Sequence, residues 1–441
     1  MTKPFSLDWR DHAIWGGSLL VFYVALAALP LALAYWMGPA SDETLLDEMG
    51  KGAGLLGFSL LVLQFALSAR FQWVEKPFGL DTIMNFHKSM GVLAGALILM
   101  HPVLLALDQG SGSLFGLKTS WPINVGKAGL LLLVLTVLLA MFFRKLRMDY
   151  NTWQFIHKGT ILVVILGFVH SILVGPDLRS TGMKAYWIAL FTMTAFLFLF
   201  RNVFVPFFGR KLFRVTSVDR ESHDTWTLAF EPEDGTTMPP HRPGQFWFLK
   251  LIRPGRSTEE HPFTISSAPT GGAPMTSTIK ASGDFTRTIG ETRPGDQAHI
   301  EGPFGRFSLL NYPAESLLFI AGGVGITPII SMLRYLRDTG DPRPAVLIYA
   351  NKTEKDILFG EELAGMPEYV RTIHILSSPN SAWQGSKGYV TTDFIQREAG
   401  KQLEKAHLFL CGPPAMMEKV LESLKELGVA GNRIHYERFS L

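Results

Sequence analysis

Long apolar stretches alternate with short polar links over the first half of the chain, and this pattern stops near Lys211. A helix needs about 20 mostly apolar residues to cross a bilayer. The apolar stretches therefore predict a six-helix transmembrane bundle. Its expected spans are residues 14–36, 52–69, 83–107, 125–143, 153–174 and 185–208.

Beyond Lys211 the periodicity is that of a water-soluble protein. Segments such as WTLAFEP and GQFWFLKLI alternate apolar and polar positions between turns rich in Pro and Gly, which predicts an antiparallel β-barrel. Later strands such as SLLFIAGG and AVLIYAN alternate with helical stretches, which predicts a parallel α/β sheet. The expected fold is a multidomain membrane protein, with a transmembrane domain at 1–210, a barrel at 211–310 and an α/β domain at 311–441.

Composition supports the membrane class and excludes one kind of partner. Of the 441 residues, 47% are hydrophobic, and the formal net charge is only +3. So mild a charge indicates no nucleic-acid partner. The single cysteine, Cys411, excludes a disulfide within the chain and fits a soluble half in a reducing compartment.

The charges of the links predict the orientation in the membrane. The link after the fourth span is basic, with Arg144, Lys145 and Arg147. The link 38–51 is acidic, with Asp42, Glu43, Asp47 and Glu48. Because cytoplasmic loops carry the excess of Lys and Arg, we expect a cell (inner) membrane protein whose termini and soluble half are cytoplasmic. A signal peptide in place of the first span is the alternative, and it leaves the later helices unchanged.

Four of the twelve histidines lie well inside apolar spans, where polar side chains are costly. His87 and His101 are fourteen residues apart on the third span, and His157 and His170 are thirteen apart on the fifth. Each spacing corresponds to about 20 Å along a helix. The third and fifth spans run parallel, so His87 pairs in depth with His157, and His101 with His170. Two such pairs predict two b-type haems, each iron held from both sides.

Two points remain open for these histidines. Polar residues in spans also serve as hydrogen-bonding contacts between helices, although four at matched depth favour ligation. On an ideal helix, thirteen residues turn the second histidine by about 140° from the first. The fifth span should therefore be distorted near Gly159 or Gly167, unless the two haems lie on different sides of it.

Four short motifs stand out in the soluble half. HPFTISSAP (261–269) and IKASGDFT (279–286) lie in the expected barrel, and AGGVGITP (321–328) and CGPPAM (411–416) in the α/β domain. Glycines at a helix N-terminus let the backbone approach a phosphate. With these motifs the chain resembles the NADPH oxidase and ferric reductase family over nearly its whole length. That family joins a two-haem membrane domain to a ferredoxin-reductase-like half.

The resemblance implies where the cofactors bind. FAD would lie along the first two motifs, in contact with His261, Pro262, Phe263, Thr264, Lys280 and Thr286. NADPH or NADH would contact Gly322, Gly323, Gly325, Thr327, Pro328, Gly412 and Pro413. Lys352, after the strand AVLIYAN, would meet a 2′-phosphate and so favours NADPH.

The resemblance also implies residues for hydride transfer. Cys411 would lie beside the reacting carbon of the nicotinamide, and Phe439 would cover the flavin face. Glu437 would be a polar contact, and Tyr436 is the alternative aromatic.

The expected function is transfer of electrons from cytosolic NAD(P)H through FAD and two haems to O2 or ferric iron at the outer face of the lipid bilayer. One alternative is a subunit that donates electrons to a periplasmic protein or a quinone. A haem-binding sensor is a third, which the flavin and nicotinamide motifs disfavour.

Overall fold

The computed structural model describes residues 9–38, 44–110, 116, 118–143, 145–233, 238–256, 258–270 and 274–438. The chain divides into two compact units, Met1–Phe208 and Gly209–Leu441. Four residues that the sequence analysis names lie outside the described residues: Asp42, Glu43, Arg144 and Phe439.

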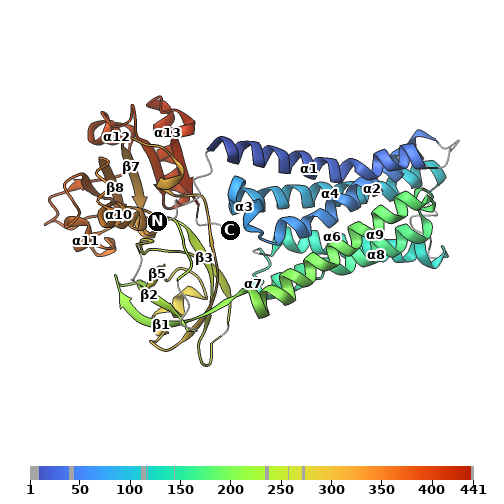
Figure 1. The fold of residues 1–441 in the computed structure, drawn as a ribbon, viewed down its shortest axis with the longest axis horizontal. Helices are drawn as coiled ribbons and strands as arrows, with labels where there is room; N and C mark the ends of the chain where they lie inside the picture. Colours follow the sequence, from blue (N-terminus) through green and yellow to red (C-terminus); the bar gives the residue numbers. More distant parts are fainter. Residues whose placement is uncertain are drawn as a thin grey trace. The chain divides into compact units, whose positions relative to one another are not determined.

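The first unit is a bundle of long helices that lie side by side (Figure 1). Six helical segments are long and apolar enough to cross a membrane, as the sequence predicts. The helices are α1 Trp9–Met37, α2 Leu45–Ser68, α3 Gln72–Phe78, α4 Leu80–Gln109, α6 Trp121–Phe142, α7 Tyr150–Lys158, α8 Thr160–Val174 and α9 Thr181–Leu199. A short 3₁₀ turn at Asp177–Arg179 precedes α9, and the π-helix η2 (Phe200–Gly209) follows it.

Helix α2 begins earlier than the sequence analysis expects. The hydroxyl of Thr44 accepts a hydrogen bond from the Asp47 backbone N–H at 3.2 Å, so Thr44 caps the helix. Ser and Thr are favoured at this position because they satisfy a free backbone donor. Asp47 and Glu48, which the sequence places in an outer link, therefore lie in the first turn of α2.

The fifth span is two helices rather than one. Helix α7 ends at Lys158 and α8 begins at Thr160, with Gly159 between them. The Gly159 N–H donates to the carbonyls of Ile156 and His157 instead of continuing the α-helical pattern. The distortion expected near Gly159 is therefore confirmed.

The second unit begins with an antiparallel sheet in the order β4-β3-β6-β1-β2-β5. Its strands are β1 Lys211–Arg220, β2 Thr225–Pro232, β3 Phe246–Ile252, β4 Glu260–Thr264, β5 Met275–Lys280 and β6 Gln297–Phe304. Alternate side chains point inward, and Phe213, Leu228 and Leu249 meet in a core that is closed to solvent. A 3₁₀ turn, η3 (Thr286–Glu291), follows the GDFT segment.

The remainder is a parallel sheet in the order β10-β9-β8-β7-β11-β12. Its strands are β7 Leu317–Gly322, β8 Ala345–Asn351, β9 Val370–Leu376, β10 Ser386–Lys387, β11 His407–Cys411 and β12 Ile434–Glu437. The helices are α10 Ile326–Thr339, α11 Gly360–Ala364, α12 Thr392–Ala399 and α13 Pro414–Glu426. Figure 1 shows that they lie around the sheet.

Two apolar cores flank the parallel sheet because successive strand residues face opposite sides. On β7, Phe319 belongs to the core formed with α10 and α11, whereas Leu318 and Ile320 belong to the core formed with α12 and α13. The expected fold class is confirmed: a six-helix membrane bundle, an antiparallel sheet and a parallel α/β domain.

Candidate functional site

The structure brings the four membrane histidines together in two pairs. The ring centres of His87 on α4 and His157 on α7 are 6.1 Å apart. Those of His101 on α4 and His170 on α8 are 6.4 Å apart. These are the pairs that the spacing in the sequence predicts.

The separations fit a metal held between two imidazoles. A nitrogen–metal bond of about 2.0 Å and about 1.1 Å from that nitrogen to the ring centre give roughly 6.2 Å between the centres of two rings on opposite sides of one ion. No group of three or more His, Cys, Asp or Glu side chains suited to a metal occurs among the described residues.

The His101–His170 pair is held in one orientation by backbone carbonyls. Nδ1 of His101 lies 2.8 Å from the carbonyl oxygen of Gly50, and Nδ1 of His170 lies 2.9 Å from that of Pro122. A carbonyl oxygen only accepts, so each Nδ1 donates its proton and each Nε2 keeps a lone pair for a metal. Hydrogen bonds of this kind fix the ring and raise its basicity as a ligand.

Two glycines make room for these rings. A Cβ built on Gly54 of α2 would lie 2.9 Å from Nδ1 of His101, and one on Gly126 of α6 would lie 2.6 Å from Nδ1 of His170. Both distances are well below van der Waals contact. Neither glycine is identified by the sequence analysis, because their role depends on which helices pack together.

The His87–His157 pair has different neighbours. The indole of Trp153 stacks on His157, with ring centres 5.3 Å apart and planes 12° apart. The backbone of Gln64 interacts with His87. Within the described residues, however, Nδ1 of neither histidine of this pair makes a hydrogen bond of normal geometry.

The expected flavin residues lie on β4 and the segment after β5. His261 stacks on Phe285 with ring centres 4.6 Å apart, and its Nε2 lies 2.9 Å from the Glu259 carboxylate. Thr264 is buried, and its backbone oxygen accepts from Ser277. Pro262 and Phe263 lie between His261 and Thr264 on the same strand.

Two further residues that are expected to bind flavin make contacts within the protein itself. Thr286 accepts hydrogen bonds from the Ser282 and Gly283 N–H groups through its hydroxyl. The Lys280 ammonium lies 3.2 Å from the Asp224 carboxylate, which the sequence analysis does not anticipate.

A cavity lies beside Glu259 and Phe285, two residues that contact His261. Its lining includes Arg253, Arg256, Glu259 and Phe285. Arg253 is 6% exposed, and its Nε makes no hydrogen bond within the described residues. Guanidinium groups bind phosphate strongly, and an aromatic ring can stack on adenine. The chemistry of the lining is therefore suited to the phosphate and adenine portions of FAD.

The motifs expected to bind nicotinamide lie at the carboxyl ends of the neighbouring strands β7 and β11. The strand order reverses between β7 and β11, the position where open α/β sheets bind ligands. Gly322 and Gly412 approach so closely that a Cβ on Gly412 would lie 3.1 Å from the Gly322 backbone nitrogen. Gly325, at the start of α10, faces the Cys411 carbonyl, and a Cβ there would lie 2.4 Å from that oxygen. A side chain is therefore excluded at Gly325, and one at Gly412 would have to displace its neighbours.

The other motif residues also lie at the carboxyl ends of the strands of this sheet. Gly323 has a φ of +52°, and its carbonyl accepts from the Tyr349 hydroxyl at 3.1 Å. Thr327 is 1% exposed, and its hydroxyl donates to the Val324 carbonyl, at the start of the helix that contains Pro328. Pro413 precedes α13, and Lys352 follows β8 and is exposed to solvent.

Cys411 and Glu437 are register partners on β11 and β12. Cys411 is fully buried. Burial raises the pKa of its thiol well above the ordinary value, and the nearby Glu437 carboxylate adds to the rise. The thiol is therefore held neutral. Tyr436 is 49% exposed, and the role of Phe439 stays a prediction.

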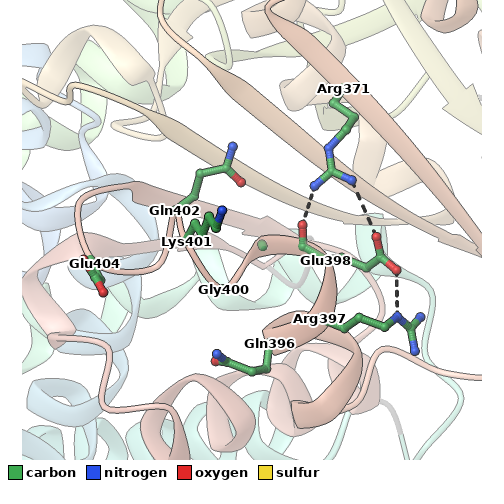
Figure 2. A pocket seen from close by; sticks show the side chains of 9 residues that line it. Arg371, Gln396, Arg397, Glu398, Gly400, Lys401, Gln402 and Glu404 are labelled. Atoms are coloured by element: carbon green, nitrogen blue, oxygen red, sulfur yellow. Dashed lines mark hydrogen bonds and ion pairs between the residues drawn. The ribbon is translucent and has the colours of Figure 1, made fainter.

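One groove in the second unit lies away from these motifs. It is lined by Arg371, Arg397, Glu398 and Lys401, and Figure 2 shows Arg371 and Arg397 both directed at Glu398. Arg371 is near the amino end of β9. The groove therefore lies at the amino ends of the strands, whereas the glycine-rich loops lie at the carboxyl ends. Arg371 and Arg397 each form an ion pair with Glu398.

Two family models match the chain. Residues 53–168 match the ferric reductase like transmembrane component, and residues 319–422 match the oxidoreductase NAD-binding domain. The chain therefore joins a region that matches a ferric reductase membrane domain to one that matches an oxidoreductase NAD-binding domain, as the resemblance to the NADPH oxidase and ferric reductase family predicts. This fusion is thus a multi-pass membrane protein with the domains of an NAD(P)H-dependent oxidoreductase.

Curated relatives include other reductases. The fusion is 32% identical over 239 residues to the glycine betaine monooxygenase reductase subunit of Pseudomonas aeruginosa, covering 52% of this chain and 64% of that one. It is 36% identical over 157 residues to NADH-cytochrome b5 reductase 1 of Debaryomyces hansenii, covering 34% and 55%. The fusion therefore spans less than two thirds of these relatives' length.

Solved structures support the fold. Flavohemoglobin from Malassezia yamatoensis superposes with a TM-score of 0.50 at 16% identity, covering 89% of this chain and 99% of that one. At so low an identity the likeness concerns the fold alone.

Proposed function

We propose that this protein carries electrons from NAD(P)H across a membrane to an acceptor on the opposite face, through FAD and two bis-histidine b-type haems. The observation that carries the proposal is the pair of imidazole separations, 6.1 and 6.4 Å, on helices of a bundle that matches ferric reductases. When bound, FAD would supply the conversion of a hydride into single electrons, and the haems would supply one-electron carriers within the bundle.

The residues of the chain would bind and orient these groups. The glycines at the β7–β11 edge bring backbone N–H groups close to a dinucleotide. His261 and Phe285 form a stacked wall beside the cavity at Arg253. The histidines of each pair, His87 with His157 and His101 with His170, would hold one haem iron between them. An acceptor such as O2 or a ferric chelate would therefore be reduced without binding to iron.

The charge distribution supports an orientation with the soluble unit and both termini in the cytoplasm of a cell with an inner membrane. Lys145 and Arg147 follow α6, whereas Asp47 and Glu48 begin α2 at the opposite end of the bundle. The excess of basic residues marks the cytoplasmic side. Exposed Lys352 after β8 supports NADPH as the donor, through contact with the 2′-phosphate.

A second function is favoured by the relatives. The Pseudomonas aeruginosa relative is named as a reductase subunit of a monooxygenase. By analogy, this chain would deliver electrons to a separate protein or a quinone rather than to a small acceptor. In that case the isolated protein would reduce its haems with NADPH but would transfer electrons slowly to O2 or ferric chelates.

The test uses the full chain purified in detergent with haem and FAD. NADPH is added without air, the haem spectrum is recorded, and air is then admitted. Reduction followed by rapid reoxidation with superoxide supports the oxidase. Haems that stay reduced in air point to another acceptor, and haems that NADPH never reduces contradict the electron path.

A histidine variant tests the order of the carriers. His101→Ala should lose one haem and the reduction of external acceptors, yet keep reduction of FAD by NADPH. Unchanged external activity in this variant would contradict the proposed path. Wild-type protein serves as the control for haem content.

A further inference from the structure

The two histidine pairs differ in how their second ring nitrogen is held. His101 and His170 each donate to a backbone carbonyl. Within the described residues, Nδ1 of His87 and Nδ1 of His157 make no hydrogen bond of this geometry, although the Gln64 backbone interacts with His87. A hydrogen bond at this nitrogen increases electron donation to the metal and stabilises the oxidised state.

The carbonyl that His101 uses belongs to Gly50, in the second turn of α2. One turn earlier, the buried carboxylate of Asp47 makes two contacts. Its Oδ1 accepts from Gln109 Nε2 at 2.6 Å, and its Oδ2 lies 2.8 Å from the Lys51 ammonium. Asp47 is 4% exposed, so solvent screens these contacts little.

The Asp47–Gln109 contact and the Gly50–His101 contact join the same two helices. Asp47 and Gly50 are on α2, and His101 and Gln109 are on α4. The first contact therefore restrains the segment that presents the Gly50 carbonyl to the ring.

We propose that Asp47 is a positioning residue for the His101–His170 pair, which ties the first turn of α2 to α4 and keeps the Gly50 carbonyl on His101. This makes the haem at this pair the harder of the two to reduce. The inference rests on the proposed function, because it assumes that each pair holds a haem.

The experiment is an optical redox titration of the full chain loaded with haem, for wild type and Asp47→Asn. The His101→Ala protein, which keeps only the His87–His157 haem, identifies which of the two transitions belongs to which pair. Loss of the hydrogen bonds that hold a metal ligand typically changes metal affinity or activity by about 10–100-fold, and we take the lower end of this range for the redox equilibrium. In Asp47→Asn we expect the reduced-to-oxidised ratio of the His101–His170 haem at fixed potential to rise about tenfold. This corresponds to a rise of about 59 mV in its midpoint potential, for one electron. The other haem should not move.

Glu48→Gln is the matched control, because it removes the same charge from the next, exposed residue of α2. Both haem transitions should stay in place in this variant. Gln109→Leu removes the donor on α4 and leaves the Asp47–Lys51 pair intact. It should shift the same transition in the same direction, and it decides the question if Asp47→Asn does not fold.

The inference is overturned if Gln109→Leu and any folded Asp47→Asn protein leave both transitions unchanged. It is also overturned if Glu48→Gln shifts the same transition as far, because charge alone would then explain the effect. Wild-type protein that binds no haem, or a single haem, would contradict the proposed function instead.

Discussion

Replacing Gly126 by alanine should expel the haem of the His101–His170 pair. A Cβ at this position would lie 2.6 Å from Nδ1 and 2.8 Å from Cγ of His170. Ordinary contacts between such atoms begin near 3.5 Å, so the ring would have to retreat by about 0.8 Å. Pro122, whose carbonyl the ring uses at 2.9 Å, is on the same helix as Gly126. Retreat from Gly126 therefore also stretches this hydrogen bond toward its limit.

The cost can be worked out from these two contacts. Overpacking costs about 1–3 kcal/mol, and the lost hydrogen bond costs about 0.5–1.5 kcal/mol. The higher helix propensity of alanine returns about 1 kcal/mol. The remaining cost is about 0.5–3.5 kcal/mol, a factor of roughly 2 to 300 in haem affinity.

The assay is haem content per chain after washing in detergent, measured as the pyridine complex. We expect two haems in wild type and close to one in Gly126→Ala. Gly17→Ala is the matched control, since a Cβ at Gly17 of α1, a helix without histidine ligands, would meet nothing within 4 Å. Retention of both haems by Gly126→Ala, with an unaltered spectrum, would show that the contact is not restrictive.

Three further predictions concern other parts of the chain. Gly159→Ala places a Cβ 2.8 Å from the Ile156 carbonyl oxygen, so it should lower the content of the His87–His157 haem and leave the other haem in place. The spectrum of His101→Ala, which keeps only the His87–His157 haem, serves as the reference that identifies which haem is lost. The raised pKa of Cys411 gives stability that is complete below the ordinary value of 9.0 and is lost as pH rises beyond it. The melting temperature of wild type should thus fall more steeply above pH 9 than that of Cys411→Ala, and equal slopes would contradict this. Arg334→Ala breaks the half-buried pair with Glu362 and the contact with the Ser266 carbonyl. It should destabilise the soluble unit by about 2 kcal/mol, measured by thermal unfolding against the exposed-site control Arg287→Ala.

The sequence predicts the histidine pairs because helical spacing and bilayer depth together leave few ways to arrange four imidazoles. It also predicts the six spans and the glycine-rich loops, since both depend on local composition. The Gly54 and Gly126 contacts are not predictable in this way, because they depend on α2 packing on α4 and α6 on α8. The position of Asp47 is missed for a different reason. Its charge indicates a loop, whereas the hydroxyl of Thr44 begins a helix there.

The interruption at Gly159 bears on how this part of the chain can change over evolution. In one continuous helix, each inserted residue turns everything beyond it by about 100°, so an insertion between two ligands would turn one of them away. Helices α7 and α8 are separate, and α8 is held by its own contacts, such as Ser171 with Trp187. A length change at this junction can therefore be absorbed while His170 stays in place. We expect homologous sequences to vary the spacing between His157 and His170 more freely than that between His87 and His101, which one helix carries.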